Sequence, residues 1–358
     1  MNSKELAYAK QGALNAKSWD TFQKVIRISL KALRPRLIPN PKASFKSVLL
    51  VLFLFGLILG HTQQSRAMTR TLQKDPAIVL VAFGTTTNAR VTYAFFEDQV
   101  RQALGPEMAH LKIAWAFTSE IVRERANKRF ADAGDPQRYQ SLAQTLANLE
   151  NEGYRKIVLQ SLHLFPGQEW DDMLLVIEAF EHLGLRIEHG GTLLHTWDQM
   201  FEAVATLEKD FLTPDQGSNI IVAHGTPKTA PGSNSTYLGL DRYLHSQYTN
   251  VAVGGIDGVL TRGQAIAWAK ANNPKRVRLI PFMYVAGDHV MNDIMGSEPD
   301  KSGEISWAME LRAAGLSVDS LTIQHGNERL YKGLGFREPI NDIFIHQIKE
   351  SLKDLGLK

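Results

Sequence analysis

The sequence contains no cysteine in 358 residues. This absence excludes disulfides, thiolate-bound metals, iron–sulfur clusters and a cysteine nucleophile. Any transition metal that the chain binds must therefore be held by imidazole, by carboxylate or by the substrate itself. A strong charge of one sign is also missing, because 40 Lys and Arg face 37 Asp and Glu, for a formal net charge of +3. We therefore expect no nucleic acid partner.

Several familiar catalytic motifs are absent as well. The chain has no HExxH, GxGxxG or GxxxxGK[ST] segment, so zinc peptidase, dinucleotide-binding and P-loop functions lack their signatures. It also lacks the GxSxG elbow of serine hydrolases. We therefore expect its functional residues to lie far apart in the sequence.

The apolar run Val48–Gly60 is too short to cross a membrane, because it has 13 residues where a helix needs ~20. Ser65 and Ala67 fit the −3 and −1 positions of a signal-peptidase site. We interpret residues 1–67 as a leader with a signal peptide cleaved near Ala67. This predicts an exported, periplasmic protein that meets the membrane only through its leader. A short uncleaved anchor and a buried core helix are the alternatives.

Buried-type strands alternate with helical segments from about Asp75 onward. The expected strands lie at 77–83, 111–117, 156–162, 185–188, 219–223 and 275–285. Strands and helices that alternate at this spacing predict an α/β fold with parallel sheets flanked by helices.

The second half of the chain repeats the plan of the first. Aligning Gly84 with Gly225 sets Phe83 against His224, and aligning Gly167 with Gly287 sets Glu169 against His289. This repeat predicts two similar lobes, at 75–200 and 215–340, that face one another across a cleft. The tail at 341–358 reads as a helix that packs back on the body. A coincidental likeness between buried strands is the alternative.

Ionisable side chains gather where the expected strands end: His163, Glu169, His224, Asp257 and His289. Ligands of open α/β sheets bind at the carboxyl ends of strands. Imidazoles and carboxylates without thiolates suit a weakly held divalent first-row metal. The same groups also suit proton transfer near neutral pH.

Each of these residues also has a purely structural interpretation. His163 can be a hydrogen-bonded core histidine, and Glu169 a first-turn acid favoured by the helix dipole. His224 and Asp257 can serve turns. Thr85, Thr86 and Thr87 can either cap the next helix or bind carboxylates of a substrate. Arg123 and Arg125 are solvated helix charges unless the ligand is an anion.

Five segments carry a family resemblance: AFGTT at 82–86, AFTSEIVRER at 116–125, LQSLHLFPGQEW at 159–170, VAHGT at 222–226 and PFMYVAGDHVMND at 281–293. They resemble the anaerobic-type sirohydrochlorin cobaltochelatases, a family of class II chelatases, over residues 77 to 350. The resemblance implies two Rossmann-like lobes with pseudo-twofold symmetry. It also implies insertion of Co²⁺, with Fe²⁺ as a second substrate metal, into sirohydrochlorin or a related tetrapyrrole for cobalamin or sirohaem biosynthesis.

The resemblance also implies roles for individual residues. His224, Asp257 and His289 would hold the metal, and His224, Glu169 and His289 would form the catalytic set, with proton removal by His224 and Glu169. Asp257 stands where the family usually has Glu, so its shorter side chain would alter metal affinity or selectivity.

The remaining expected contacts are with the substrate. Sirohydrochlorin is rich in carboxylates, which Thr85, Thr86, Arg90 and Arg123 would receive. His163 matches the SLH of the family and belongs with this substrate-binding group rather than with the metal ligands.

A binding protein is the rival function. The predicted leader suits an exported carrier of a tetrapyrrole, haem or cobalt on a chelatase scaffold, since sirohydrochlorin is made in the cytoplasm. The sequence leaves open whether a haem is carried and whether the chain forms a homo-oligomer.

Overall fold

The computed structural model describes residues 71–229, 231–272 and 274–357. The predicted leader therefore lies outside the described residues. The described residues belong to one compact unit, Arg70–Lys358. No helix found within them is both long enough and apolar enough to cross a membrane.

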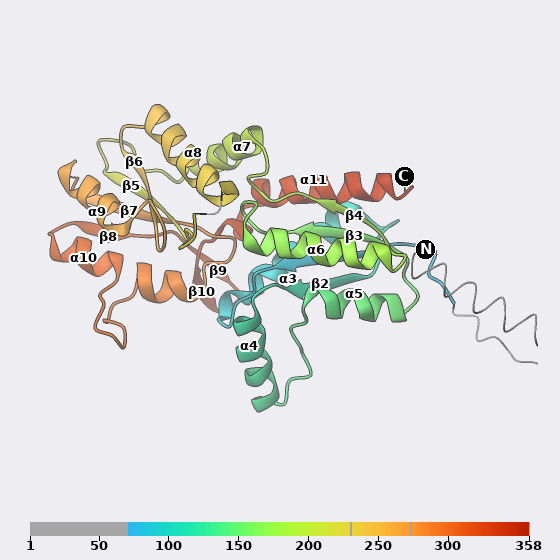
Figure 1. Cartoon of the computed structure of the whole chain (residues 1–358). Helices are drawn as coiled ribbons and strands as arrows, with labels where there is room; N and C mark the ends of the chain where they lie inside the picture. The colour runs from blue at the N-terminus through green and yellow to red at the C-terminus, as the bar shows by residue number, and fades with distance from the viewer. Residues whose placement is uncertain (1–70, 230, 273, 358) are drawn as a thin grey trace, which may run out of the picture. The chain divides into compact units, whose positions relative to one another are not determined.

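Two four-stranded parallel sheets form the centre of this unit (Figure 1). Their orders are β2-β1-β3-β4 and β6-β5-β7-β8, so the two sheets share one topology. This shared order confirms the two-lobed α/β fold that the sequence repeat predicts. The strands are β1 (Ala77–Ala82), β2 (Ile113–Phe117), β3 (Lys156–Ser161), β4 (Arg186–Gly190), β5 (Ser218–Ala223), β6 (Val251–Gly255), β7 (Arg276–Phe282) and β8 (Ser317–Asp319).

Helices connect and cover the strands, as parallel pairing requires. They are α3 (Val91–Leu104), α4 (Glu120–Asp132), α5 (Leu142–Asn151), α6 (Gln168–His182), α7 (Trp197–Glu208), α8 (Pro231–Gln247), α9 (Arg262–Ala271), α10 (Trp307–Ala313) and α11 (Glu338–Asp354). Three short helical turns complete the set in the described part of the chain: η1 (Asn88–Arg90), the π-helical η2 (Val290–Ile294) and η3 (Leu334–Phe336).

Local sequence explains why these elements begin where they do. All six residues of β1 are buried, as are all six of β5, because each strand is covered on both faces. Serine or threonine side chains cap several helix starts, and three of these caps are full capping boxes with a glutamine at the third helical position. The boxes are Ser141 with Gln144, Thr196 with Gln199, and Thr261 with Gln264. Each satisfies backbone N–H groups that the helix leaves unpaired.

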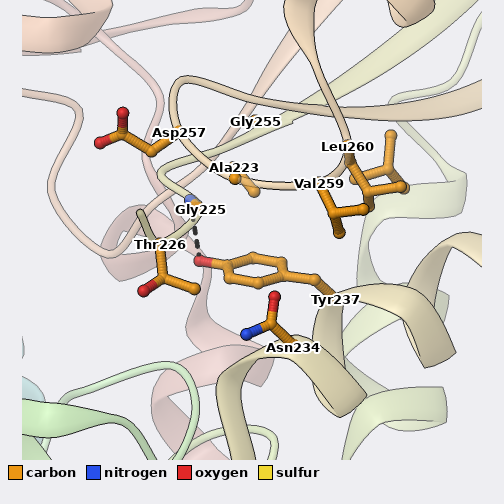
Figure 2. A pocket seen from close by; sticks show the side chains of 11 residues that line it. Ala223, Gly225, Thr226, Asn234, Tyr237, Gly255, Asp257, Val259 and Leu260 are labelled. Atoms are coloured by element: carbon orange, nitrogen blue, oxygen red, sulfur yellow. Dashed lines mark hydrogen bonds between the residues drawn. The ribbon is translucent and has the colours of Figure 1, made fainter. Parts of the chain in front are cut away.

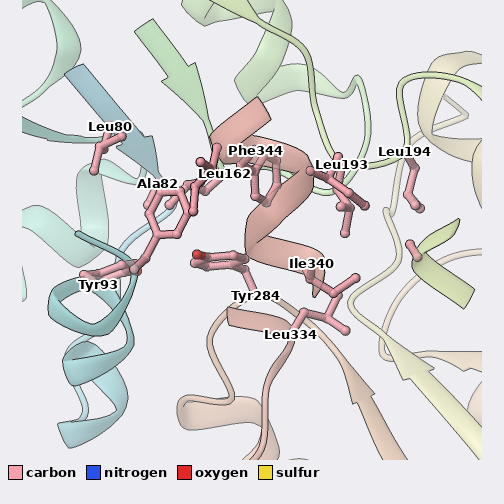
Figure 3. Packing of buried hydrophobic residues seen from close by; sticks show 14 of the residues in the cluster. Leu80, Ala82, Tyr93, Leu162, Leu193, Leu194, Tyr284, Leu334, Ile340 and Phe344 are labelled. Carbon is pink, nitrogen blue, oxygen red and sulfur yellow. The ribbon is translucent and has the colours of Figure 1, made fainter. Parts of the chain in front are cut away.

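One hydrophobic cluster joins the two sheets (Figure 3). Phe96 of α3, Tyr284 after β7 and Phe344 of α11 form a ring triangle with centroid distances of 6.0, 6.2 and 5.8 Å. The Tyr284 hydroxyl donates to Asn341 Oδ1 at 3.0 Å. Helix α11 also contacts β3, β4, α3 and α7, so the chain end packs on the first sheet.

An antiparallel hairpin, β9 (Thr322–His325) and β10 (Glu328–Tyr331), lies outside the two main sheets. The strand pattern of the sequence did not predict it. Its Glu328 accepts a hydrogen bond at 3.0 Å from the side chain of Asn88 in η1. The hairpin therefore links the second half of the chain to the segment that follows β1.

Candidate functional site

Two histidines meet at the edge where β5 and β7 end. His224 follows Ala223, the last residue of β5, and His289 lies seven residues beyond the end of β7. The strands are parallel neighbours with Ala223 opposite Phe282, so both loops leave the same edge. The ring centroids are 5.0 Å apart and the ring planes cross at 80°. Both residues are half-buried, which leaves their rings accessible to a ligand.

The hydrogen-bond partners of the two rings fix their tautomers. His224 Nδ1 faces the carbonyl oxygen of Gly225 at 3.2 Å, and His289 Nδ1 faces Asp293 Oδ2 at 2.5 Å. A carbonyl and an ionised carboxylate only accept hydrogen bonds, so Nδ1 carries the proton in each neutral ring. The Nε2 lone pair of each ring is then the one available to a metal or a proton.

Asp257 lies beside this pair through its backbone. Its N–H donates to the carbonyl oxygen of His224 at 2.9 Å, while its side chain is exposed. Figure 2 shows the Asp257 carboxylate directed away from Tyr237. Across the described ranges, no group of three or more His, Asp or Glu residues is arranged to hold a metal ion. The structure thus brings the two imidazoles together, and ligation by Asp257 stays a prediction.

Tyr237 of α8 is hydrogen-bonded to the loop that contains His224, a role that no sequence pattern indicated. Its hydroxyl accepts a hydrogen bond from the Gly225 N–H at 3.1 Å (Figure 2). The residue lines a small pocket with Ala223, Gly225, Thr226, Asn234, Val253, Gly255, Asp257, Gly258, Val259 and Leu260. Burial raises the pKa of Tyr237, the Gly225 hydrogen bond lowers it, and the carboxylate of Glu169 raises it further. The phenol therefore stays protonated at neutral pH.

Glu169 is presented from the first sheet. It occupies the first turn of α6, a helix whose start at Gly167 has no side-chain cap, and it is half-buried. Its carboxylate is one of the groups that raise the pKa of Tyr237 in α8. The ring of Phe165, in the same loop, lies 4.7 Å from the ring of Tyr237. The loop after β3 thus lies against Tyr237, whose hydroxyl bonds to the Gly225 N–H next to His224.

Two close contacts show how the strand-end loops of the lobes face one another. A Cβ on Gly232, at the start of α8, would lie 2.5 Å from the carbonyl oxygen of Pro166 after β3. A Cβ on Gly287, after β7, would lie 2.8 Å from Thr85 Oγ1 after β1. Because β1 corresponds to β5 and β3 to β7, exchanging the lobes converts one contact into the other. This agrees with the predicted pseudo-symmetry.

His163 has both ring nitrogens occupied within the first lobe. Nδ1 lies 2.8 Å from Ser161 Oγ, and Nε2 lies 3.2 Å from Thr118 Oγ1. Burial lowers the pKa of His163 to about 4, so the ring is neutral at physiological pH. These contacts favour the structural interpretation of His163, and its predicted substrate contact stays a prediction.

The threonines after β1 bond mainly to one another and to the backbone. Thr85 is buried, and its Oγ1 lies 3.0 Å from Thr87 Oγ1 and accepts from the Thr87 N–H at 3.2 Å. Thr87 caps η1 by accepting from the Ala89 N–H. The Thr86 carbonyl accepts from Arg129 Nη1 at 2.6 Å. The capping alternative therefore holds for Thr87, while Thr85 and Thr86 remain predicted substrate contacts.

The two predicted substrate arginines differ in their surroundings. Arg123 Nη1 donates to the carbonyl oxygens of Phe117 and Thr118, each at 2.7 Å, and thereby closes the loop between β2 and α4. Arg90 is exposed, and its guanidinium carbon lies 5.3 Å from the ring centroid of Phe130. Arg90 is thus the freer of the two to receive a carboxylate.

The chain is similar to curated proteins and to solved structures. A sirohydrochlorin cobaltochelatase, CbiKC, from Nitratidesulfovibrio vulgaris is 26% identical over 265 residues, which cover 71% of this chain and 84% of that protein. A sirohydrochlorin cobaltochelatase from Salmonella typhimurium is 25% identical over 239 residues, which cover 66% and 82%. The solved structure of SirB from Bacillus subtilis with Fe³⁺ has the same fold, with a TM-score of 0.50 at 11% identity, over 78% of this chain and 97% of SirB.

A match to a protein-family profile shows which family the chain belongs to. The profile described as cobalt chelatase (CbiK) matches residues 76–353, which include both sheets, the histidine pair and Glu169. This match confirms the resemblance read from the sequence motifs. The protein belongs to the cobalt chelatase (CbiK) family and is a metal chelatase.

Proposed function

We propose that this protein inserts Co²⁺ into sirohydrochlorin for cobalamin biosynthesis, with Fe²⁺ as a second substrate metal that would yield sirohaem. One observation carries the proposal: two imidazoles that follow neighbouring strands lie with their ring centroids 5.0 Å apart, each with Nδ1 engaged, in a member of the cobalt chelatase family. The two curated relatives described above are both named sirohydrochlorin cobaltochelatases, which supports this choice of tetrapyrrole.

The chemistry of metallation matches the groups at the site. Two pyrrole N–H protons must leave the ring as one divalent metal enters, so the reaction needs a metal donor and two proton acceptors. His224 and His289 can hold Co²⁺ through Nε2 and release it, because two neutral imidazoles make a weak site. His224 and Glu169 are the proposed proton acceptors, since both types of group can act as general bases.

The carboxylates of the substrate require cationic or N–H donors. Arg90 is the strongest candidate, because it is exposed and lies in η1, just after the loop that follows β1. The backbone N–H groups of Thr85 and Thr86 and the uncapped start of α6 are further candidates, whereas the Thr87 N–H already donates to Thr85 Oγ1. Arg123 would contribute only by turning away from two backbone carbonyls.

Anaerobic metallation of sirohydrochlorin tests the proposal. The protein is mixed with an excess of sirohydrochlorin and Co²⁺, and the visible spectrum is followed, with Fe²⁺ in a parallel series. We expect many turnovers per protein, and a loss of at least ~100-fold in turnover for His224→Ala and for His289→Ala. Metallation that stops at one equivalent would reject the enzyme and support a carrier of cobalt or tetrapyrrole.

We further propose that the folded body is exported to the periplasm. The apolar run Val48–Gly60 and the small residues Ser65 and Ala67 support this. Fractionation of cells that express the full chain tests it. We expect the protein in the periplasmic fraction with an N-terminus near Met68, and full-length protein in the cytoplasm would reject export.

A further inference from the structure

The two histidines at the site are held by partners of different charge. His224 Nδ1 faces a neutral carbonyl oxygen at 3.2 Å, whereas His289 Nδ1 faces the Asp293 carboxylate at 2.5 Å. His289 and Asp293 lie on consecutive turns at the start of the π-helical segment η2, where Met295 N–H bonds to Val290 O at 3.0 Å. Such π turns occur frequently at functional sites.

Among the described residues, the Asp293 carboxylate pairs with His289. Within the part of the chain that the structure describes, no Lys or Arg forms an ion pair with Asp293. The neighbouring amide, Asn292, is engaged elsewhere, because its Nδ2 donates to Asp288 Oδ1 at 3.0 Å. The side chains of His289 and Asp293 are 43% and 41% exposed, so the pair sits at the surface of the site where a metal can reach the ring.

A carboxylate on the far nitrogen of a metal-binding imidazole has two known effects. It fixes the ring orientation and tautomer, and it makes the free nitrogen a better electron donor. A neutral carbonyl at a longer distance does the same more weakly, since hydrogen bonds to charged acceptors are roughly twice as strong. The two rings at this site are therefore unequal, with His289 the better donor.

We infer that Asp293 is a positioning residue that makes His289 the principal donor to the incoming Co²⁺. His224, whose Nδ1 faces the neutral Gly225 carbonyl, is then the weaker metal donor and the ring more easily released to take a pyrrole proton. This division of labour rests on the proposed function, in which Co²⁺ is a substrate that the site must bind and then give up.

Direct Co²⁺ binding by the full chain, measured by calorimetry without tetrapyrrole, tests the inference. We expect Asp293→Asn, which keeps the shape and loses the charge, to weaken Co²⁺ binding by ~10- to 100-fold. Asp293→Glu restores a carboxylate and should recover most of this loss. In steady-state metallation the KM for Co²⁺ should rise by a similar factor, with kcat and the KM for sirohydrochlorin little changed.

Asp241→Asn is the matched control. Asp241 pairs with His245 Nδ1 at 3.1 Å with the same four-residue spacing, but on α8 and away from the strand ends. We expect this variant to bind Co²⁺ as the wild type does. Unchanged Co²⁺ binding by Asp293→Asn, or an equal loss in both asparagine variants, would overturn the inference.

A second comparison needs no change at Asp293. His289→Ala should weaken Co²⁺ binding more than His224→Ala does, and the opposite order would overturn the inference. If the two variants lose Co²⁺ binding in this order but the wild type does not metallate sirohydrochlorin, the proposed function fails and the inference stands. The binding and turnover measurements therefore distinguish a failure of the inference from a failure of the proposed function.

Discussion

Glu169 and Asp171 both lie in the first turn of α6, whose N-terminal N–H groups no side chain caps. The helix dipole favours both acids, but only Glu169 is half-buried and exerts an electrostatic effect on Tyr237. Asp171 is exposed. The same turn thus holds the acid that we propose as a proton acceptor, Glu169, and an exposed acid, Asp171, that serves as its control.

Glu169→Gln should lower kcat for Co²⁺ insertion by ~100-fold or more, because the amide cannot accept a pyrrole proton. Co²⁺ binding without tetrapyrrole should change little, since the histidines hold the metal in our proposal. Turnover and calorimetry on the same preparations measure both effects. Asp171→Asn should behave as the wild type, and equal activity in both variants would reduce Glu169 to an ordinary first-turn acid.

His163 makes the stability of the fold depend on pH. Its pKa is lowered to about 4 by burial, whereas the unfolded chain binds the proton near the ordinary value of about 6.5. Stability is therefore fully present above pH ~6.5 and is lost as the pH falls toward 4, because only the unfolded state then gains a proton. We expect this group to lower the unfolding free energy by about 2 kcal/mol, which is less than the full ~1.4 kcal/mol for each pH unit between the two pKa values, because His163 as a residue is only half-buried.

Urea unfolding between pH 4 and 7 measures this loss. His163→Gln removes the titrating ring, so its unfolding free energy should fall less steeply with decreasing pH than that of the wild type. Parallel curves for the two proteins would show that His163 does not carry the dependence.

At the scale of elements, the turn that follows β5 is built on a glycine. Gly225 has φ +79°, and a Cβ there would lie 1.8 Å from the carbonyl oxygen of Asp257. Both the backbone conformation and the close approach exclude a side chain. Since His224 precedes and Tyr237 supports this glycine, the turn decides where the first imidazole points.

Gly225→Ala should destabilise the protein by about 3 kcal/mol and abolish most Co²⁺ binding, because strain and a steric clash act together. Gly315→Ala is the matched control, since Gly315 has φ +84° and a Cβ there would meet no atom within 4 Å. It should cost about 1 kcal/mol from backbone strain alone. Chemical unfolding of both variants measures the difference in their free energies of unfolding. Equal losses would show that the steric clash does not contribute.

At the scale of the whole molecule, one core serves both sheets. Phe344 is fully buried, and its ring contacts Phe96 from the first half of the chain and Tyr284 from the second. The chain thus returns through α11 to pack both halves together. A shared core of this kind predicts that the two lobes unfold in one cooperative transition.

Phe344→Ala should lower the free energy of unfolding by about 3–5 kcal/mol, the usual cost of emptying a buried aromatic site. Calorimetry should still show a single transition, shifted to lower temperature. Leu175→Ala, at a position that is 65% exposed, should have almost no effect. Separate transitions for the two halves in the wild type would contradict a shared core.

Much of this architecture follows from local sequence. Continuous buried runs predict the strands of parallel sheets, and capping residues predict helix starts, because both depend on neighbours within a few residues. The repeat predicts two similar lobes, and the strand-end rule predicts that His224 and His289 share one edge. The β9–β10 hairpin was not predicted, since its short and partly exposed strands carry no such pattern.

The state of each site residue depends on contacts between distant segments, which only the tertiary structure decides. The sequence determined that His163, His224 and His289 follow strands. The fold decided that the first has both nitrogens occupied and that, among the described residues, the other two engage a hydrogen-bond partner through Nδ1. The supporting role of Tyr237 and the outward side chain of Asp257 were likewise decided by the fold. A hydrogen bond requires two groups within about 3 Å, and loops from separate strands reach that distance only when the whole sheet is assembled.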